Sequence, residues 1–557
     1  MTTTLIAKYV YLRNMAYSLA PFSQVLGLRK AKHLLRRATF NYSKDTLNSI
    51  ASMSASEALA FLSENPANML AEPFDYQNDG YWTSSTELPG SFSQQGQKRA
   101  YITGWWWYNA INQTSLKHKL SYFLFTSFTV SNGNGAGAAT YFYDYIRLLD
   151  FYAMGSIKTF AKKITLDNAM LNYLDNTDNN ATNPNENYAR EFLELFTILK
   201  GPQISEGDYT NYTELDVQET AKVFTGFKRQ NDRSIIDPDT NLPIGYNNLN
   251  KHDTSDKVFS NAFNNQVITG QSTAIGMTQE LDDFVEMIFA QEATAMSYCR
   301  KLYRYFVKSE WDSSVETEII TPLAQDLILN NFELLPTVTK LLSSEHFYDE
   351  DTEDNTDEIF GAIVKSPMQL LNEMITFFDI SIPNPETSAE DFYNSFFRKF
   401  LYNSYLAGAG MAFFSPPSVA GYPAHYQEPD FDRHWFSSTT IVSRYKLIES
   451  LIAGRNKISP NAFIMTQIDT VSFVENNIEN PSSISDLVAE LASFLYPEEI
   501  EPTRRDYFIQ IALDGYEEYY WSLAWSNYTT NGDDIIVRNR LNALITVMVN
   551  ASEFQLM

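Results

Sequence analysis

The sequence predicts a mostly α-helical protein, a large multi-helical array with long polar loops and little or no β-sheet. Apolar residues recur at helical spacing along most of the chain, whereas the alternation of apolar and polar residues that marks a strand is scarce. Of the 557 residues, 44% are hydrophobic and 14% are aromatic, which is ample material for a large core. Length and composition therefore favour a globular helical body.

The predicted helices follow one another along the chain. Residues 29–37 contain a short basic run. The segments with helical periodicity are residues 45–62, 115–129, 141–174, 278–307, 316–344, 363–378 and 535–551. The cluster of Trp105, Trp106, Trp107 and Tyr108 could form a stacking platform for sugars or a partner surface. Consecutive residues on a helix point in different directions, so we expect at least two of the four in the core.

Three long polar segments separate these helices, namely residues 64–97, 231–254 and 420–438. Loops of this length inside a compact domain are often functional. The third one carries Trp435, together with two histidines and two aspartates, and Trp435 is therefore a candidate binding residue.

We expect four parts along the chain. They are an N-terminal arm (residues 1–26), an N-terminal helical region with the sequence NENYARE (27–260), a central helical region with an acidic insertion (261–360) and a C-terminal helical region (361–557).

A short helix near residue 185 carries the densest chemistry of the chain. Asn183 is a good N-cap, and Pro184 suits the first turn, where its missing N–H would be unpaired anyway. The helix is therefore expected to begin near Asn185. A second helix begins at Thr213, with Asp216 in the place of a capping-box acid, and Gly226 is placed to end it.

In the first of these helices one arginine lies between two acids. Glu186, Arg190 and Glu194 are successive i, i+4 neighbours, and Asn187, Glu191 and Glu194 share a face. This pattern can orient a carboxylate for chemistry, or it can form a solvated, salt-bridged surface. A third interpretation is a structural network, in which the asparagines cap backbone and Arg190 bridges two acids, so that Arg190→Ala would unfold the protein.

The segment before this helix spaces oxygen-bearing side chains in the manner of a calcium loop, from Asp175 to Glu186. The fit to an EF-hand is poor, because Asn180 stands where the turn requires glycine. A looser calcium or other cation site, with Asp175 and Glu186 as ligands, is the alternative.

Several segments resemble one known family. PNENYAREFLELFT, YTELDVQETAKVFTGF and KHDTSDKVF look like the core of the bacterial family called domain of unknown function 1800. AKHLLRRATF, ATAMSYCRKLYRYFV, IVKSPMQLL, FFSPPSVAGYP, SRYKL and the closing SEFQLM follow in family order. The resemblance extends from about residue 27 to residue 557.

The resemblance implies no agreed activity. Members are often extracytoplasmic and tend to accompany a sulfatase-like or phosphatase-like companion protein. KHDTSDKVF matches a family motif, which makes His252, Asp253 and Lys257 candidate site residues.

The chain departs from the family where FWHNHF is expected. It has FLFTSF, so Leu124, Phe125 and Ser127 replace a tryptophan and two histidines. Two imidazoles in this spacing could bind a metal or act as acid and base, which an aromatic ring and a hydroxyl cannot do. Chemistry that depends on those histidines is not expected in this member.

Other catalytic patterns are absent from the sequence. There is no GxSxG elbow, no Walker-type phosphate loop and no GxGxxG, and the six histidines include no pair at i, i+4. The single cysteine, Cys299, lies in a predicted helix beside aromatic residues and is expected to be structural.

Charge and hydropathy exclude further classes. A net charge of −27 argues against nonspecific nucleic-acid binding, which needs clustered Lys and Arg. No stretch is long and apolar enough for a transmembrane span. The first 22 residues lack the order of a clear signal peptide, so an extracytoplasmic or cell-surface location has a cytoplasmic alternative.

Two functions follow from these observations, and whether the protein is an enzyme stays open. The first is a structural or interaction protein, catalytically degenerate, that acts with protein partners or as a homo-oligomer in an extracytoplasmic or surface assembly. The alternative is a hydrolase-like enzyme or calcium-dependent binder that acts on a polymeric or anionic substrate through residues 185–194. Its candidate catalytic residues are Glu186, Arg190, Glu191, Glu194, His252 and Asp253; its candidate binding residues are Asn185, Asn187, Lys257 and Trp435; its candidate metal ligands are Asp175 and Glu186.

Overall fold

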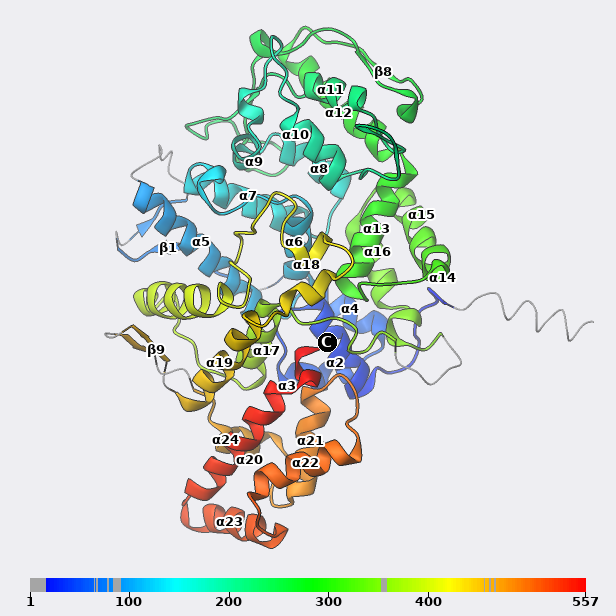
Figure 1. Cartoon of the computed structure of the whole chain (residues 1–557). Coiled ribbons are helices and arrows are strands. Elements are labelled where there is room, and N and C mark those ends of the chain that lie inside the picture. Colours follow the sequence, from blue (N-terminus) through cyan, green and yellow to red (C-terminus); the bar gives the residue numbers. More distant parts are fainter. Residues whose placement is uncertain are drawn as a thin grey trace, which may run out of the picture.

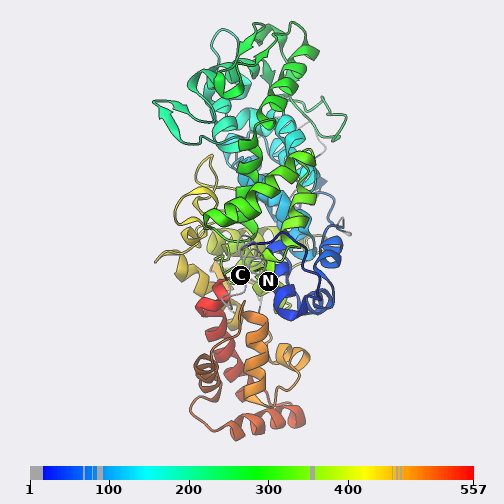
Figure 2. The same cartoon turned by 90° about the vertical axis from the view of Figure 1, so that its right-hand side faces the viewer.

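The computed structural model describes residues 17–64, 66, 69–77, 80–83, 92–351, 358–454, 456–459, 462–464 and 467–557. It confirms the predicted fold class, since 59% of the chain is helical and 6% lies in short two-stranded sheets. The helices form an elongated body (Figure 1; Figure 2). Helices α8 (Ile157–Thr165) to α12 (Ala274–Phe289) lie at one end, and α20 (Thr470–Asn477) to α24 (Ile535–Asn550) lie at the other.

The N-terminal helices begin at α2, which contains the basic run of residues 29–37. In order they are α2 (Gly27–Ala38), α3 (Lys44–Ala51), α4 (Ala55–Leu62), α5 (Phe92–Asn112) and α6 (Leu116–Ser127), with β1 (Phe74–Asp75) and β2 (Gly80–Tyr81) between α4 and α5. The predicted single helix over 45–62 is two helices, because Ser54 forms a capping box with Glu57 and starts a new one. Most of the polar segment 64–97 precedes α5, and residues 84–91 of it lie outside the described residues.

All three consecutive tryptophans of α5 are buried, one more than the minimum expected. Their indole N–H groups find separate acceptors: Trp105 donates to the Leu70 carbonyl, Trp106 to Asp150 and Trp107 to Asn372. The cluster is therefore a core feature and offers no free stacking surface.

The predicted long helix over 141–174 is divided into three. Helices α7 (Ala139–Tyr152), α8 and α9 (Asn168–Tyr173) are separated because Ser156 and Asp167 each accept a backbone N–H at the start of a new helix. Apolar periodicity continues across such breaks, so it does not reveal them.

Residues 186–268 form the end of the body that contains short hairpins. The elements are α10 (Glu186–Glu191), the π-helical η3 (Phe192–Phe196), β3 (Gln203–Ser205), β4 (Asp208–Tyr209), α11 (Glu214–Val223), β5 (Phe227–Lys228), β6 (Tyr246–Asn247), β7 (Lys257–Val258) and β8 (Val267–Ile268). Each strand pairs only with its neighbour, antiparallel. Gly226 follows α11 with a positive φ of 83°, as expected for a helix end.

The central helices are α12, α13 (Glu292–Phe306), α14 (Ser313–Val315), the π-helical η6 (Glu316–Ile320), α15 (Thr321–Leu329) and α16 (Leu334–Leu342). The prediction of one helix over 278–307 is wrong, because the chain turns at Ala290 and Gln291 between α12 and α13. Residues 352–357 of the predicted acidic insertion lie outside the described residues.

The C-terminal helices begin with α17 (Pro367–Phe377), which the sequence predicts closely. There follow the π-helical η8 (Asp391–Leu406), α18 (Pro423–Tyr426), the 3₁₀ turn η9 (Phe431–Trp435), α19 (Thr440–Ala453), β9 (Asn456–Ser459), β10 (Ala462–Ile464), α20, α21 (Ile484–Leu495), α22 (Pro502–Leu513), α23 (Glu518–Asn531) and α24. No helix in the described residues is long and apolar enough to cross a membrane.

Two buried arginines of α2 bind segments from all parts of the sequence. Arg36 donates to Glu373 of α17 at 3.0 Å and to the Leu495 carbonyl at 2.8 Å. Arg37 donates to the carbonyls of Val307 and Ile359 at 2.8 and 3.2 Å. Because these charges are almost fully buried, loss of any of these bonds should destabilise the fold strongly.

Candidate functional site

The signature helix begins at Glu186, close to the expected start near Asn185, but its N-cap differs from the predicted one. Asn185, and not Asn183, is the N-cap, since its side chain accepts the backbone N–H of Asn187. The Asn187 amide in turn donates to the Leu174 carbonyl at 3.1 Å. Both asparagines therefore bond to nearby backbone groups.

Arg190 is the centre of an ion-pair network between two helices. It donates to Glu186 at 3.0 Å and to both carboxylate oxygens of Glu214 in α11, at 3.0 and 2.7 Å. Hydrogen bonds from Arg190, together with its charge, lower the pKa of Glu214. The three side chains are 37–39% exposed, so the network lies at the surface and ties α10 to α11.

The expectation that Glu194 is the second acid on Arg190 is wrong. The helix changes from α to π geometry at Phe192, which shifts Glu194 out of line. Glu194 pairs with Lys200 instead. The remaining acid, Glu191, is partly buried, and burial and the charge of Glu194 raise its pKa.

The predicted cation ligands do not form a cluster. Glu186 is bonded to Arg190, and Asp175 occupies a left-handed turn position. Across the described part of the chain, no group of three or more His, Cys, Asp or Glu side chains is placed to hold a metal ion.

His252 and Lys257 belong to a second, fully buried network. His252 bonds to the Thr225 carbonyl through Nδ1 at 2.8 Å and to Glu280 through Nε2 at 3.1 Å. Lys257 pairs with the other oxygen of Glu280 at 2.5 Å. These three side chains are 0% exposed, so a substrate does not reach them in this structure.

The side chain of Asp253 stays outside that network and shapes its own loop, while its backbone carbonyl accepts from Lys257 Nζ and its N–H donates to the Thr225 hydroxyl. Its carboxylate accepts the backbone N–H and the hydroxyl of Ser255. Burial opposes ionisation of Asp253, but these hydrogen bonds prevail and lower its pKa.

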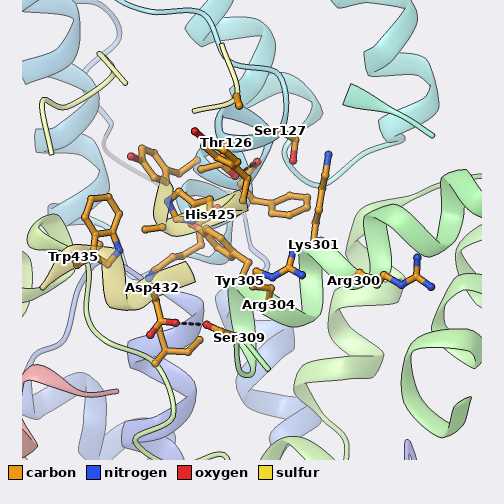
Figure 3. A pocket seen from close by; sticks show the side chains of 18 of the residues that line it. Thr126, Ser127, Arg300, Lys301, Arg304, Tyr305, Ser309, His425, Asp432 and Trp435 are labelled. Atoms are coloured by element: carbon orange, nitrogen blue, oxygen red, sulfur yellow. Dashed lines mark hydrogen bonds between the residues drawn. The ribbon is translucent and has the colours of Figure 1, made fainter. Parts of the chain in front are cut away.

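A cavity of about 400 Å³ lies near the middle of the body, where three of the predicted regions meet. Its walls come from the end of α6, from one side of α13, and from the segment that contains α18 and η9 (Figure 3). The labelled lining residues are Thr126, Ser127, Arg300, Lys301, Arg304, Tyr305, Ser309, His425, Asp432 and Trp435.

Helix α13 provides the positive charge of this cavity. Lys301 donates to the carbonyl of Leu195, in η3, at 2.6 Å, and burial and the nearby Arg304 lower its pKa to about 7. Arg304 lies 4.0 Å above the Phe431 ring, and burial lowers its pKa to about 10, against the opposing charge of Glu428. The Nε atom of Arg304 is buried and has no hydrogen-bond partner among the described residues.

His425 lies against the aromatic part of the wall. Its ring centroid is 6.0 Å from that of Tyr305 and 5.9 Å from that of Trp435. Burial and the charge of Arg304 lower the pKa of His425 to about 4, so it is neutral at pH 7. Its Nε2 atom is buried, and the described part of the protein offers it no hydrogen-bond partner.

The floor of the cavity is largely saturated with hydrogen bonds. Asp432 accepts the Ser309 hydroxyl and the Val364 N–H, and Lys119 donates to Gln369 Oε1 at 2.7 Å. Gln369 Nε2 is a further buried nitrogen without a partner within the described residues. On the outer side, the exposed Tyr426 and Glu428 line the opening, so the cavity reaches the surface.

A family model described as "Protein of unknown function (DUF1800)" matches residues 33–556. The chain belongs to the DUF1800 family. No curated protein and no solved structure matches it. The description of the DUF1800 family assigns no activity.

In this DUF1800 protein, segments that resemble the family motifs converge on the cavity. The ATAMSYCRKLYRYFV segment supplies Lys301 and Arg304, IVKSPMQLL supplies Gln369, which directly precedes its two leucines, and FFSPPSVAGYP supplies Val419. Ser127, at one of the two positions where a family histidine is expected, also lines it. These motifs are separate segments between residues 293 and 423, and they share one site in the fold with Ser127.

Sequence reasoning identified Trp435 among the lining residues but missed Lys301, Arg304, Gln369 and His425 as site residues. One signal was present. Arg300, Lys301 and Arg304 form a basic group on one side of a helix, in a chain with a net charge of −27.

Proposed function

We propose that this DUF1800 protein binds a small organic anion in the central cavity. The observation that carries the proposal is that three buried nitrogens without partners line one cavity: Arg304 Nε, Gln369 Nε2 and His425 Nε2. A buried polar atom without a hydrogen bond costs about 1–3 kcal/mol, so a ligand that accepts hydrogen bonds from these groups gains affinity.

The charge of the cavity supports an anion. Arg300 is already paired with Glu316 at 2.8 Å, whereas Arg304 and Lys301 form no ion pair within the described residues. Lys119 donates to the neutral amide oxygen of Gln369, so its charge is not compensated either. A charged hydrogen bond in a desolvated site is about twice as strong as a neutral one. The protein as a whole is strongly acidic and repels anions, but the local positive charge of such a site attracts them.

The walls indicate the shape of the ligand. Tyr305, His425 and Trp435 present rings beside the charged groups, and Phe40 and Phe123 also line the cavity. Ring faces pack well against flat or ring-shaped ligands. We therefore propose a ring compound with one acidic group.

The sequence-based alternative placed an anionic substrate at residues 185–194. This proposal keeps an anionic ligand but places it in the central cavity. Both terminal nitrogens of Arg190 are bonded to Glu186 and Glu214 at the surface, whereas Arg304 has a buried Nε without a partner in the described residues. The two places are connected, because the Lys301 ammonium binds the Leu195 carbonyl at the end of the signature segment.

Matched pairs of an anion and a neutral analogue test the proposal. The protein is titrated calorimetrically with glucuronate and glucose, and with benzoate and benzyl alcohol. We expect the anion of at least one pair to bind more tightly than its neutral analogue, and to raise the melting temperature.

Two variants locate that binding. Arg304→Gln should reduce the affinity for the anion at least tenfold, because it removes one of the positive charges of the cavity together with the unpartnered Nε. Arg433→Gln removes the same charge from an arginine that is 63% exposed and paired with Glu310, and it should bind like the wild type. Equal binding of anion and neutral analogue in both pairs, or an unaffected Arg304→Gln, would overturn the proposal.

As a second function we propose an interaction role, which the sequence also predicts. The observation in its favour is that seven exposed, large apolar side chains lie on α22, α23 and α24 and in the turn before α23. They are Tyr507, Tyr516, Tyr519, Tyr520, Leu523, Ile535 and Ile536. Patches of this kind often mark protein interfaces.

A further inference from the structure

A groove of about 650 Å³ runs between α23 and α24, at the end of the body far from the hairpins (Figure 1). Helix α23 lines it with Tyr520, Leu523, Ala524 and Asn527, and helix α24 lines it with Ile536, Asn539 and Arg540. Asp514 and Tyr516, in the turn before α23, complete it.

The lining residues follow helical spacing on both sides. Those of α23 are at positions i, i+3, i+4 and i+7, and those of α24 are at i, i+3 and i+4. The groove is thus formed by one face of each of two packed helices. Two such faces present the ridges and grooves into which a third helix packs.

The apolar side chains of this groove remain open to solvent. Tyr520, Leu523 and Ile536 are 50%, 50% and 52% exposed. An apolar helix face laid across them would remove this surface from water, at about 25 cal/mol for each Å² buried.

The charge around the groove is acidic. Asp514, Glu517, Glu518 and Asp533 are exposed near its ends, while Arg540 is held over the Tyr516 ring at 5.1 Å. Complementarity favours a partner with basic residues beside its apolar stripe. A second copy of this chain would bring the same acidic residues against these ones, which disfavours a symmetric dimer here.

We infer that this groove binds one amphipathic helix of a partner protein, with its apolar stripe in the groove and lysines or arginines along its edges. The inference rests on the interaction role proposed above and is independent of the ligand in the central cavity. Recognition is of the helix-in-groove kind, in which apolar residues at i, i+3, i+4 and i+7 serve as anchors.

Two labelled peptides of identical composition test this. One has leucines at i, i+3, i+4 and i+7 and lysines elsewhere, which gives an amphipathic helix. The other has the same residues with leucine and lysine alternating. Fluorescence anisotropy with the full chain should show that the first peptide binds at least tenfold more tightly.

Substitutions locate the site. Leu523→Asp and Ile536→Asp should each reduce the affinity for the amphipathic peptide at least tenfold. Because both side chains are exposed, the variants should keep the wild-type melting temperature. Leu329→Asp, at an 82% exposed leucine of α15, is the matched control and should bind like the wild type. Equal binding of the two peptides, or an unaffected Leu523→Asp variant, would overturn the inference.

Light scattering separates this inference from the interaction role itself. If the chain is oligomeric and Leu523→Asp makes it monomeric, a second copy occupies the groove; the helix inference then fails and the interaction role stands. If neither peptide binds and Leu523→Asp leaves the oligomeric state unchanged, both the helix inference and the interaction role fail. Binding of organic anions in the cavity is not affected by either result.

Discussion

Arg190 and Glu214 form a two-pronged ion pair that joins two helices, with Nη1–Oε2 at 3.0 Å and Nη2–Oε1 at 2.7 Å. Glu186 accepts a further bond from the same guanidinium, so one arginine binds two acids from different segments. The signature sequence thus forms a clamp between α10 and α11, and its conspicuous charges are satisfied within the protein.

The clamp should contribute modestly to stability. Arg190 and Glu214 are 37% and 39% exposed, and exposed ion pairs contribute about 0.2–1 kcal/mol each. We expect Arg190→Ala to lower the free energy of unfolding by about 1 kcal/mol in urea denaturation, which is less than the unfolding that sequence reasoning alone suggested. Arg433→Ala, which removes an exposed arginine paired with Glu310, is the control. A variant that is unfolded at room temperature would contradict this.

The ion pair between Arg190 and Glu214 should make the free energy of unfolding depend on pH. Arg190 holds the pKa of Glu214 below its ordinary value of 4.5, so the unfolded state takes up this proton at a higher pH than the folded state. The contribution is complete above about pH 4.5 and is lost as the pH falls below that value. The stability difference between wild type and Glu214→Gln, measured from pH 7 down to pH 3, should therefore shrink below pH 4.5. A constant difference would show that the charge of Glu214 does not matter.

The buried network around Glu280 should contribute far more to the free energy of unfolding than the surface clamp at Arg190. Lys257→Met leaves the Glu280 carboxylate at 0% exposure without its lysine, and loss of one partner from a buried pair costs about 3–5 kcal/mol. Lys251→Met changes an exposed lysine six residues earlier and should be close to neutral. Calorimetric unfolding of both variants measures the difference. Equal melting temperatures would mean that water reaches Glu280.

Anion binding in the cavity should weaken as the pH rises through neutrality. Burial and Arg304 bring the pKa of Lys301 to about 7, so the cation that attracts the ligand is present below this pH and lost above it. His425, with a pKa of about 4, and Arg304, with a pKa of about 10, keep their charge states in this range. If only the protonated lysine binds, affinity should fall about tenfold from pH 6 to pH 8. Lys301→Met should bind weakly at both values, and a wild type without this dependence would exclude Lys301 from the site.

Much of the fold could be predicted because local rules determine it. Helical periodicity gave the fold class, and the Thr213 capping box forms as predicted, with the Asp216 carboxylate accepting the Thr213 N–H. Helix breaks at Ser54 and Ser156 were missed because a capped start does not interrupt the apolar pattern. The N-cap of α10 was assigned to Asn183 and not to Asn185 because the two asparagines are equally good caps by type.

The site was harder to predict because it depends on long-range packing. The acid that binds Arg190 comes from the next helix, and no i, i+4 rule connects them. The cavity brings Gln369 and His425 to α13 from distant segments, and nothing in their local sequence marks them as neighbours. The conspicuous charges of the NENYARE segment form a structural clamp between α10 and α11. The less conspicuous RKLYR segment lines the cavity.

Anomalous scattering from bromide locates anion affinity most directly. Crystals of the full chain soaked in bromide should show an ion in the cavity, within hydrogen-bond distance of Arg304 Nε, and crystals of Arg304→Gln should lack it there. Bromide ions found only on the outer surface, with none beside Arg304 in the wild type, would contradict the assignment of this cavity as an anion site.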